Sequence, residues 1–168
     1  MEFEASKKKF IQTWGVLGGN WGINRTMAQI HALLLISHEA LSAEDIMEAL
    51  QISRGNANQN IRDLIDWGLA FREFKTGERK EFFTAQKDIW AVAKQIVKER
   101  RKREIEPVRK ILSELKNTKP IKDSEAEKHF VKMISSIDDV VGKMDNSVEQ
   151  LIKLDESAIV GTLFKLFK

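Results

Sequence analysis

The chain has 168 residues, of which 42% are hydrophobic and 32% charged, and its formal net charge is +3. This length and composition indicate a globular protein of one domain, or one domain with an appended element, and argue against disorder. The absence of cysteine excludes disulfides, thiol nucleophiles and cysteine-ligated metals, and it suits a reducing cytosol. Two prolines and no tyrosine favour a mainly helical fold.

The N-terminal segment, residues 1–22, is predicted to be a helix followed by a loop that together form a dimer arm. Apolar residues recur at helical spacing from residue 6 to residue 17. The run GVLGGNWGIN then contains four glycines, so we expect the helix to end there. The first residues lack an apolar signal core, and no run approaches the roughly 18 apolar residues of a membrane span. We therefore expect a cytoplasmic protein without membrane contact.

Residues 23–87 are predicted to contain a helix-turn-helix. Residues 26–38 form a helix that is apolar on almost every side of its centre, which is typical of a buried helix. Ser42 is a good N-cap for a short third helix, and Asp45 follows it by three residues, as in a capping box. After a tight turn, a fourth helix begins at Ser53. The second helix of such a motif lies in the DNA major groove.

The fourth helix, expected over residues 53–67, opens with RGNANQN, although amides are mediocre helix formers. A helical projection turns one set of polar side chains outward, away from the apolar face. Amides can bond adenine, and guanidinium groups can bond guanine or phosphate. We therefore assign base readout to the outward set, Arg54, Asn56, Gln59 and Arg62. The alternative is that the amides only solvate or cap the helix.

Further contacts with DNA are predicted beside this set. Gly55 permits close approach of the backbone, and Ser53, Asn58 and Asn60 are candidate phosphate or scaffold contacts. For Asn60, a hydrogen bond to the backbone of the preceding helix is the alternative.

Residues 70–85 read AFREFKTGERKEFFTA, and their alternation on both sides of Thr76-Gly77 predicts a β-hairpin. Its tip, residues 75–81, carries Lys75, Arg79 and Lys80. A basic hairpin after a helix-turn-helix is a wing, which reaches the adjacent backbone or minor groove and displaces counterions there. The alternative is that these cations serve solubility, since three glutamates dilute their charge.

Residues 88–168 are predicted to form a long linker helix and a C-terminal helical dimerisation region. Pro107 interrupts or kinks the linker helix. From about residue 124, apolar residues alternate spacings of four and three, which predicts a helix packed along another helix. They are Phe130, Ile134, Ile137, Val141, Met144, Val148 and Leu151. The apolar surface continues through Ile152, Ile159, Leu163 and Leu166.

The chain resembles the GbsR-type branch of the MarR-like winged helix-turn-helix transcriptional regulators. The matching blocks are WGVLGGNWGIN (14–24), QIHALLLIS (29–37), ISRGNANQNIRDLIDWGL (52–69), KTGERKEFFTAQKDIW (75–90) and KERRKREIEP (98–107). They follow the family's order and spacing over about the first 107 residues, whereas the C-terminal third matches only in being helical and apolar. The matching motif residues are Ser53, Arg54, Gly55, Asn56, Asn60 and Arg62 in the recognition helix and Gly77, Arg79 and Lys80 in the wing. Asn24 stands where many relatives have proline.

The resemblance implies a mainly α fold, in which a winged helix-turn-helix with a small β-hairpin wing is flanked by N- and C-terminal dimerisation helices. It also implies a homodimer that binds a pseudo-palindromic operator in double-stranded DNA, commonly as a repressor. Family members of known role sense small molecules, among them choline or glycine betaine. Such an effector is therefore a candidate partner, but its identity does not carry over from the resemblance.

Choline recognition requires an aromatic cage. Trp14 and Trp21 are candidates for an effector pocket, with core packing as the alternative. His31 and His38 lie two turns apart, which is not the usual spacing of metal ligands on a helix. We therefore expect no metal, no cofactor and no enzyme activity. Two other functions remain open, a winged-helix protein-interaction module and a non-specific, chromatin-type DNA binder.

Overall fold

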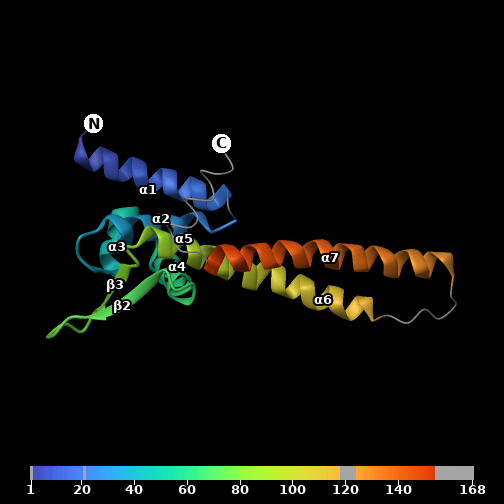
Figure 1. Ribbon diagram of the computed structural model, residues 1–168. Helices are drawn as coiled ribbons and strands as arrows, with labels where there is room; N and C mark the ends of the chain where they lie inside the picture. The colour runs from blue at the N-terminus through green and yellow to red at the C-terminus, as the bar shows by residue number, and fades with distance from the viewer. Residues whose placement is uncertain (1, 21, 118–123, 154–168) are drawn as a thin grey trace. The chain divides into compact units, whose positions relative to one another are not determined.

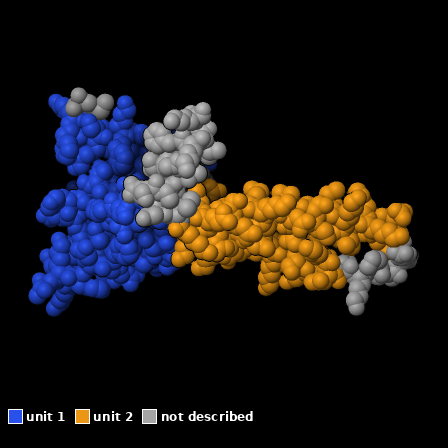
Figure 2. Space-filling model, in the orientation of Figure 1, with its two compact units in different colours: residues 1–95 blue, residues 96–168 orange. Residues whose placement is uncertain are grey.

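The computed structural model describes residues 2–20, 22–117 and 124–153, so Ile159, Leu163 and Leu166 lie outside the described residues. The chain divides into two compact units, unit 1 (residues 1–95) and unit 2 (residues 96–168) (Figure 2). The fold is mainly helical, as predicted, and contains a small three-stranded sheet. Among the described residues, no helix is long and apolar enough to cross a membrane.

The first helix continues through Gly15, Gly18 and Gly19 and ends at Asn20, inside the glycine-rich run and later than predicted. Helix α1 spans Phe3–Asn20 and lies along α2, Arg25–Ile36 (Figure 1). A Cβ atom on Gly18 would lie 2.5 Å from Cβ of Ala28, and one on Gly15 would lie 2.6 Å from Cγ of Gln29. These glycines therefore allow the two helices to approach closely, and their helix-breaking tendency is overridden by the packing.

Helix α2 is the centre of unit 1, and both of its ends are capped by side chains. Asn24 Oδ1 accepts hydrogen bonds from the backbone amides of Thr26 and Met27, at 2.8 and 3.3 Å. At the other end, Lys87 Nζ donates to the carbonyl oxygens of Leu34, Leu35 and Ser37. These contacts satisfy groups that a helix leaves without partners within itself. A polar residue in place of the family's proline is thus an effective cap.

His31 is buried in α2, and burial, with the nearby charge of Lys87, lowers its pKa from 6.5 to about 4. The unfolded state therefore binds a proton more readily, so stability falls as pH decreases from 6.5 through 4. We expect the free energy of unfolding of unit 1 to lose about 2–3 kcal/mol between pH 7 and pH 4.5 through this group. Denaturant titrations at both pH values measure this loss. In a His31→Leu variant the difference between the two pH values should shrink by that amount, and an unchanged difference would refute the assignment.

The helix-turn-helix is confirmed in its details. Helix α3, Ala43–Leu50, begins with the predicted capping box between Ser42 and Asp45. Helix α4, Arg54–Asp66, has Ser53 as its N-cap. It ends as predicted at Gly68, whose φ is +69°, with the amide of Leu69 bonded to the carbonyl of Leu64 at 2.9 Å. Residues directly adjacent in the sequence therefore determine both ends of α4: a serine side chain at the start and a glycine backbone at the end.

The wing belongs to a three-stranded antiparallel sheet of order β1-β3-β2. Strands β2, Ala70–Phe74, and β3, Glu81–Ala85, form the predicted hairpin. The two-residue strand β1, Leu41–Ser42, pairs with β3 and was not predicted. Phe82, Phe83 and Ala85 of β3 are buried, so the base of the hairpin is part of the core of unit 1.

The linker helix continues past Pro107 without a break, because the helix changes from α to π in the five residues before α6. Helix α5, Ile89–Arg100, leads into the π-helical segment η1, Arg101–Ile105, and then into α6, Glu106–Lys116. The proline lies in the first turn of α6, directly after the wider π turns. A proline at the centre of an α-helix would clash with the preceding turn and remove a hydrogen bond. The predicted interruption is thus a local change of helix type.

Helix α7, Glu125–Lys153, packs along α6, but the predicted heptad is split between two stripes. Ile134, Val141 and Val148 are partly buried. Phe130, Ile137, Met144 and Leu151 are exposed, as are Met133 and Val140 between them. These six exposed residues are spaced by three and four as far as Met144, and Leu151 follows one heptad later; we call them the outer stripe. The helix hairpin of unit 2 therefore leaves an apolar surface uncovered.

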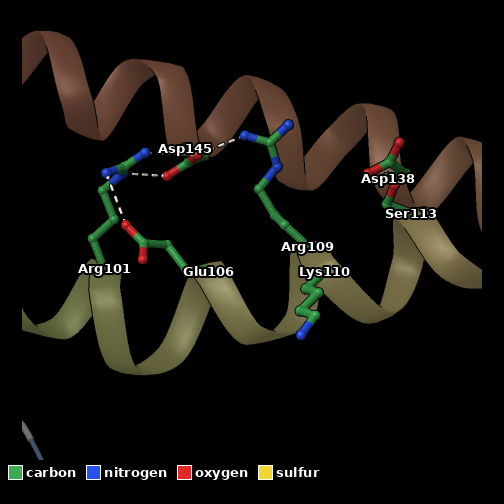
Figure 3. Close-up of a pocket in the computed structure, with 7 residues that line it drawn as sticks. All are labelled: Arg101, Glu106, Arg109, Lys110, Ser113, Asp138 and Asp145. Atoms are coloured by element: carbon green, nitrogen blue, oxygen red, sulfur yellow. Dashed lines mark hydrogen bonds and ion pairs between the residues drawn. The ribbon is translucent and has the colours of Figure 1, made fainter.

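Asp145 is the polar centre of the α6–α7 contact and is only 1% exposed (Figure 3). Arg101 Nε donates to Asp145 Oδ1 at 2.5 Å, and Arg109 Nη1 donates to Oδ2 at 2.7 Å. The hydrogen bond from Arg101, supported by that from Arg109, holds the pKa of Asp145 below its usual value. Beside these groups lies a polar cavity of about 380 Å³. The three side chains fasten η1 and α6 to α7.

Replacing Asp145 with alanine is expected to destabilise unit 2 by about 3 kcal/mol, because Arg109 loses its carboxylate partner and Arg101 is left with Glu106, at 3.2 Å. Since the carboxyl pKa is lowered in the folded state, the lost stabilisation is the part present above about pH 4. Thermal unfolding at pH 7 and pH 3 measures it. Asn146→Ala, at the neighbouring exposed position, is the control. Equal stability of wild type and Asp145→Ala at pH 7 would contradict this role.

Candidate nucleic-acid interface

The outer face of α4 presents the predicted readout side chains to solvent. Arg54, Asn56, Gln59 and Arg62 are all exposed, while Ala57 on the inner face is fully buried. Ser53 Oγ accepts a hydrogen bond from the backbone amide of Asn56, which fixes the first turn of the helix. The structure therefore brings these four side chains together on one accessible surface, together with the exposed Gly55 and Asn58.

Asn60 differs from this set because its side chain is only 2% exposed. Its Nδ2 atom donates to the carbonyl of Asn56 at 2.8 Å and to Asn56 Oδ1 at 2.6 Å. The predicted DNA contact of Asn60 does not fit this buried position, and the bond to the preceding helix is not formed either. Asn60 instead holds Asn56, so its influence on the interface is indirect.

Two of the exposed side chains have partners within unit 1. Arg54 Nη2 lies 3.4 Å from Glu44 Oε1, and Gln59 Nε2 donates to Asp63 Oδ1 at 3.0 Å. Exposed pairs of this kind contribute little to stability. The arginine and the glutamine can therefore exchange these partners for a ligand at small cost.

The wing extends the cationic surface beyond the helices of unit 1 (Figure 1). Residues 71–80 are all exposed, including Arg79 and Lys80. Lys75 Nζ lies 4.3 Å from the ring centroid of Phe82, which orients it by a cation–π contact. The hydroxyl and amide of Ser42 lower the pKa of Asp45, with smaller contributions from Lys80 and Lys75. The field of the wing cations thus reaches the first turn of α3.

Of the two tryptophans predicted to line an effector pocket, the structure describes only Trp14. Trp14 is half-buried, with its ring centroid 5.5 Å from that of Phe10 and 6.3 Å from that of His31, so it takes part in the α1–α2 packing. Trp21 lies outside the described residues. The effector role of both stays a prediction.

A cavity that the sequence did not reveal lies among α1, α2 and α3, with a volume of about 420 Å³. Its apolar lining comes from Ile11, Leu33 and Leu50, and Lys7 and Lys8 stand at its polar side. It could not be read from the sequence, because its lining combines residues of three helices whose packing depends on contacts between distant segments. Among the described residues, no group of His, Asp and Glu side chains could hold a metal ion.

The model of the MarR family matches residues 21–80, which include α2, α3, α4 and most of the hairpin. The matched segment is therefore similar to the winged helix of the MarR family. No curated protein matches the chain in sequence. The MarR match ends at the wing, so α1 and unit 2 lie outside it.

Three solved structures resemble the chain over most of its length. A crystal structure of a transcriptional regulator has a TM-score of 0.57 at 20% identity, covering 86% of this chain and 99% of that chain. A mutant of S. aureus MepR bound to an oligodeoxyribonucleotide scores 0.41 at 15% identity, covering 79% and 91%. A MarR transcriptional regulator from Methanosarcina mazei Go1 scores 0.34 at 16%, covering 97% and 83%. The first of these likenesses supports the fold.

Proposed function

We propose that the chain is a homodimeric, sequence-specific DNA-binding transcriptional regulator of the GbsR-type branch, and that it acts as a repressor without catalysis. One observation carries the proposal. The amides and arginines of α4 are gathered on an exposed face, on a helix that is capped at both ends, beside an exposed basic wing. A surface helix that served solubility alone would carry glutamate and lysine, which favour the helix more than asparagine does.

In the proposed complex, α4 enters the major groove. Asn56 and Gln59 bond adenine edges, and Arg54 and Arg62 bond guanine or phosphate. The wing tip lies on the adjacent backbone or minor groove, where Arg79 and Lys80 displace counterions. The winged helix thus combines sequence readout by one element with charge-based positioning by another.

The outer stripe of α7 supports the homodimer. A hairpin of two helices buries little apolar surface by itself. The outer stripe also has the spacing of a coiled-coil seam, and it extends over about three heptads. A second copy of unit 2 would cover this stripe with its own, as a two-fold axis requires. Two copies of α4 would then meet half-sites about one helical turn apart, so the operator is a pseudo-palindrome.

The cavity among α1, α2 and α3 supports release by a small-molecule effector. Its apolar lining suits the body of an organic molecule, and Lys7 and Lys8 offer charge at one side. Because α3 lines it through Ala49 and Leu50, a ligand there would bear on the helix that precedes α4. Trp14 lies on the same helix as Ile11 and belongs to the adjoining packing.

Salt dependence tests the function against its two alternatives. We expect purified protein to retard duplexes selected from a random pool, with affinity falling about 10³-fold between about 50 and 200 mM salt. We also expect a selected duplex to bind at least about 10³-fold more tightly than unrelated DNA. Retardation without a sequence ratio would indicate a chromatin-type binder. No retardation, or a flat salt response, would indicate a protein-interaction module.

A further inference from the structure

Phe74 is the most exposed large apolar side chain among the described residues, at 78%. It is the last residue of β2, directly before the hairpin tip, and Figure 1 shows that this hairpin projects from the helices of unit 1. Burial cannot explain an apolar ring at this place, because a solvent-exposed phenylalanine gives up the stabilisation that an aromatic ring gains in a core.

The register of the hairpin shows where the core ends. Ala70 and Ala85 pair at the base and are both buried. Two residues further out, Arg72 pairs with the buried Phe83. Phe74 pairs with the exposed Glu81 at the outer end of the same face. Since side chains alternate along a strand, Phe74 lies on the same face as these pairs, past the last residue that unit 1 covers and next to the Arg72–Glu81 ion pair at 3.8 Å.

The tip of the hairpin beyond Phe74, residues 75–80, is exposed and carries three cations and one glutamate. Arg79 and Lys80 stand on its returning side, while the ammonium group of Lys75 is held over the Phe82 ring at 4.3 Å, on the opposite face of the hairpin from Phe74. An exposed apolar ring beside a tip with an excess of cations fits a ligand with a negative rim and a stacked, apolar interior. A DNA minor groove has both features, since phosphates border the edges of the bases.

We infer that Phe74 is an apolar wedge that enters the minor groove and partly unstacks one base step. This inference rests on the proposed function and adds a specificity-determining residue to it. Phenylalanine is among the residues that minor-groove proteins insert in this way, and the insertion kinks the duplex toward the major groove. Pyrimidine–purine steps unstack most easily. The wing therefore selects a TA or CA/TG step at a fixed distance from the α4 half-site, without hydrogen bonds to its bases.

The test uses a duplex recovered by selection with the wild-type protein, carrying 2-aminopurine at the step next to the half-site and a fluorophore pair at its ends. Binding of wild type is expected to raise 2-aminopurine fluorescence and to shorten the end-to-end distance. Phe74→Ala should lose both signals and bind about tenfold more weakly, on the scale of one lost aromatic stack. Phe74→Leu, which keeps an apolar wedge, should restore most of both signals.

Phe71→Ala is the matched control, because Phe71 lies on the opposite face of the same strand and is 45% exposed. It should leave both signals unchanged. Unaltered fluorescence and distance in Phe74→Ala, with wild-type affinity, would overturn the wedge and leave the proposed function standing. So would a change in sedimentation alone, since it would assign Phe74 to self-association. Recovery of no duplex by wild-type protein would overturn the proposed function and the wedge together.

Discussion

Replacing Arg54, Asn56, Gln59 and Arg62 together with alanine is expected to abolish sequence-specific DNA binding. Each good contact with a base edge is worth about 1–3 kcal/mol, and a dimer carries the set twice. Affinity for a selected duplex should therefore fall at least about 10³-fold, to the level of unrelated DNA. All four side chains are exposed, and alanine favours a helix, so thermal unfolding should not be impaired. Gel retardation with the selected duplex measures the effect.

The control for charge is a variant with Lys132→Ala and Lys143→Ala, which loses two positive charges from exposed positions of α7. It should bind the selected duplex nearly as well as wild type. If the quadruple variant kept its preference for the selected duplex, the assignment of the outer face of α4 would be wrong. If it lost affinity for every duplex evenly, the four side chains would be holding phosphate.

Placing glutamate at Ile137 and Val140 together should convert the protein to a monomer. Both residues belong to the outer stripe, where the proposed dimer would bury two carboxylates of each copy in an apolar seam. A monomer contacts a single half-site, so affinity for the full operator should drop at least about 100-fold through lost avidity. Sedimentation gives the mass, and retardation gives the affinity.

Asn146→Glu with Gln150→Glu is the matched variant, because it adds two carboxylates to exposed positions of α7 outside the outer stripe. It should sediment as wild type does. A dimer that survives the Ile137 and Val140 changes would show that a different surface joins the two copies.

The parts of the fold that could be predicted depend on neighbours in sequence. Ser42 and Asp45 define the start of α3, and Gly68 defines the end of α4, because caps use atoms within a few residues. The match of the MarR family model to residues 21–80 agrees with the MarR-like resemblance, while the GbsR-type branch stays a prediction.

The parts that could not be predicted depend on distant partners. Gly18 allows close approach to Ala28, but from sequence alone it is indistinguishable from a glycine that breaks a helix. Lys87 caps α2 from more than 50 residues away along the chain. The heptad of α7 has two neighbouring stripes, and only the position of α6 determines which of them is covered.

The exposure of the predicted readout side chains could be read from the sequence, whereas the burial of Asn60 could not, and DNA contact by these residues stays a prediction. The helical projection placed Arg54, Asn56, Gln59 and Arg62 outward, and all four are exposed. Asn60 was included because it matches the family motif, yet it is buried against Asn56. A motif residue can thus serve the site by positioning a neighbour, a distinction that needs the burial of each side chain.

Selection of bound duplexes from a random pool by the wild-type protein tests the central claim most directly. If α4 reads bases in a two-fold dimer, the recovered sequences share an inverted repeat whose half-sites are centred about 10 base pairs apart. Recovered sequences without a common motif, or with a motif that lacks the repeat, would contradict the account.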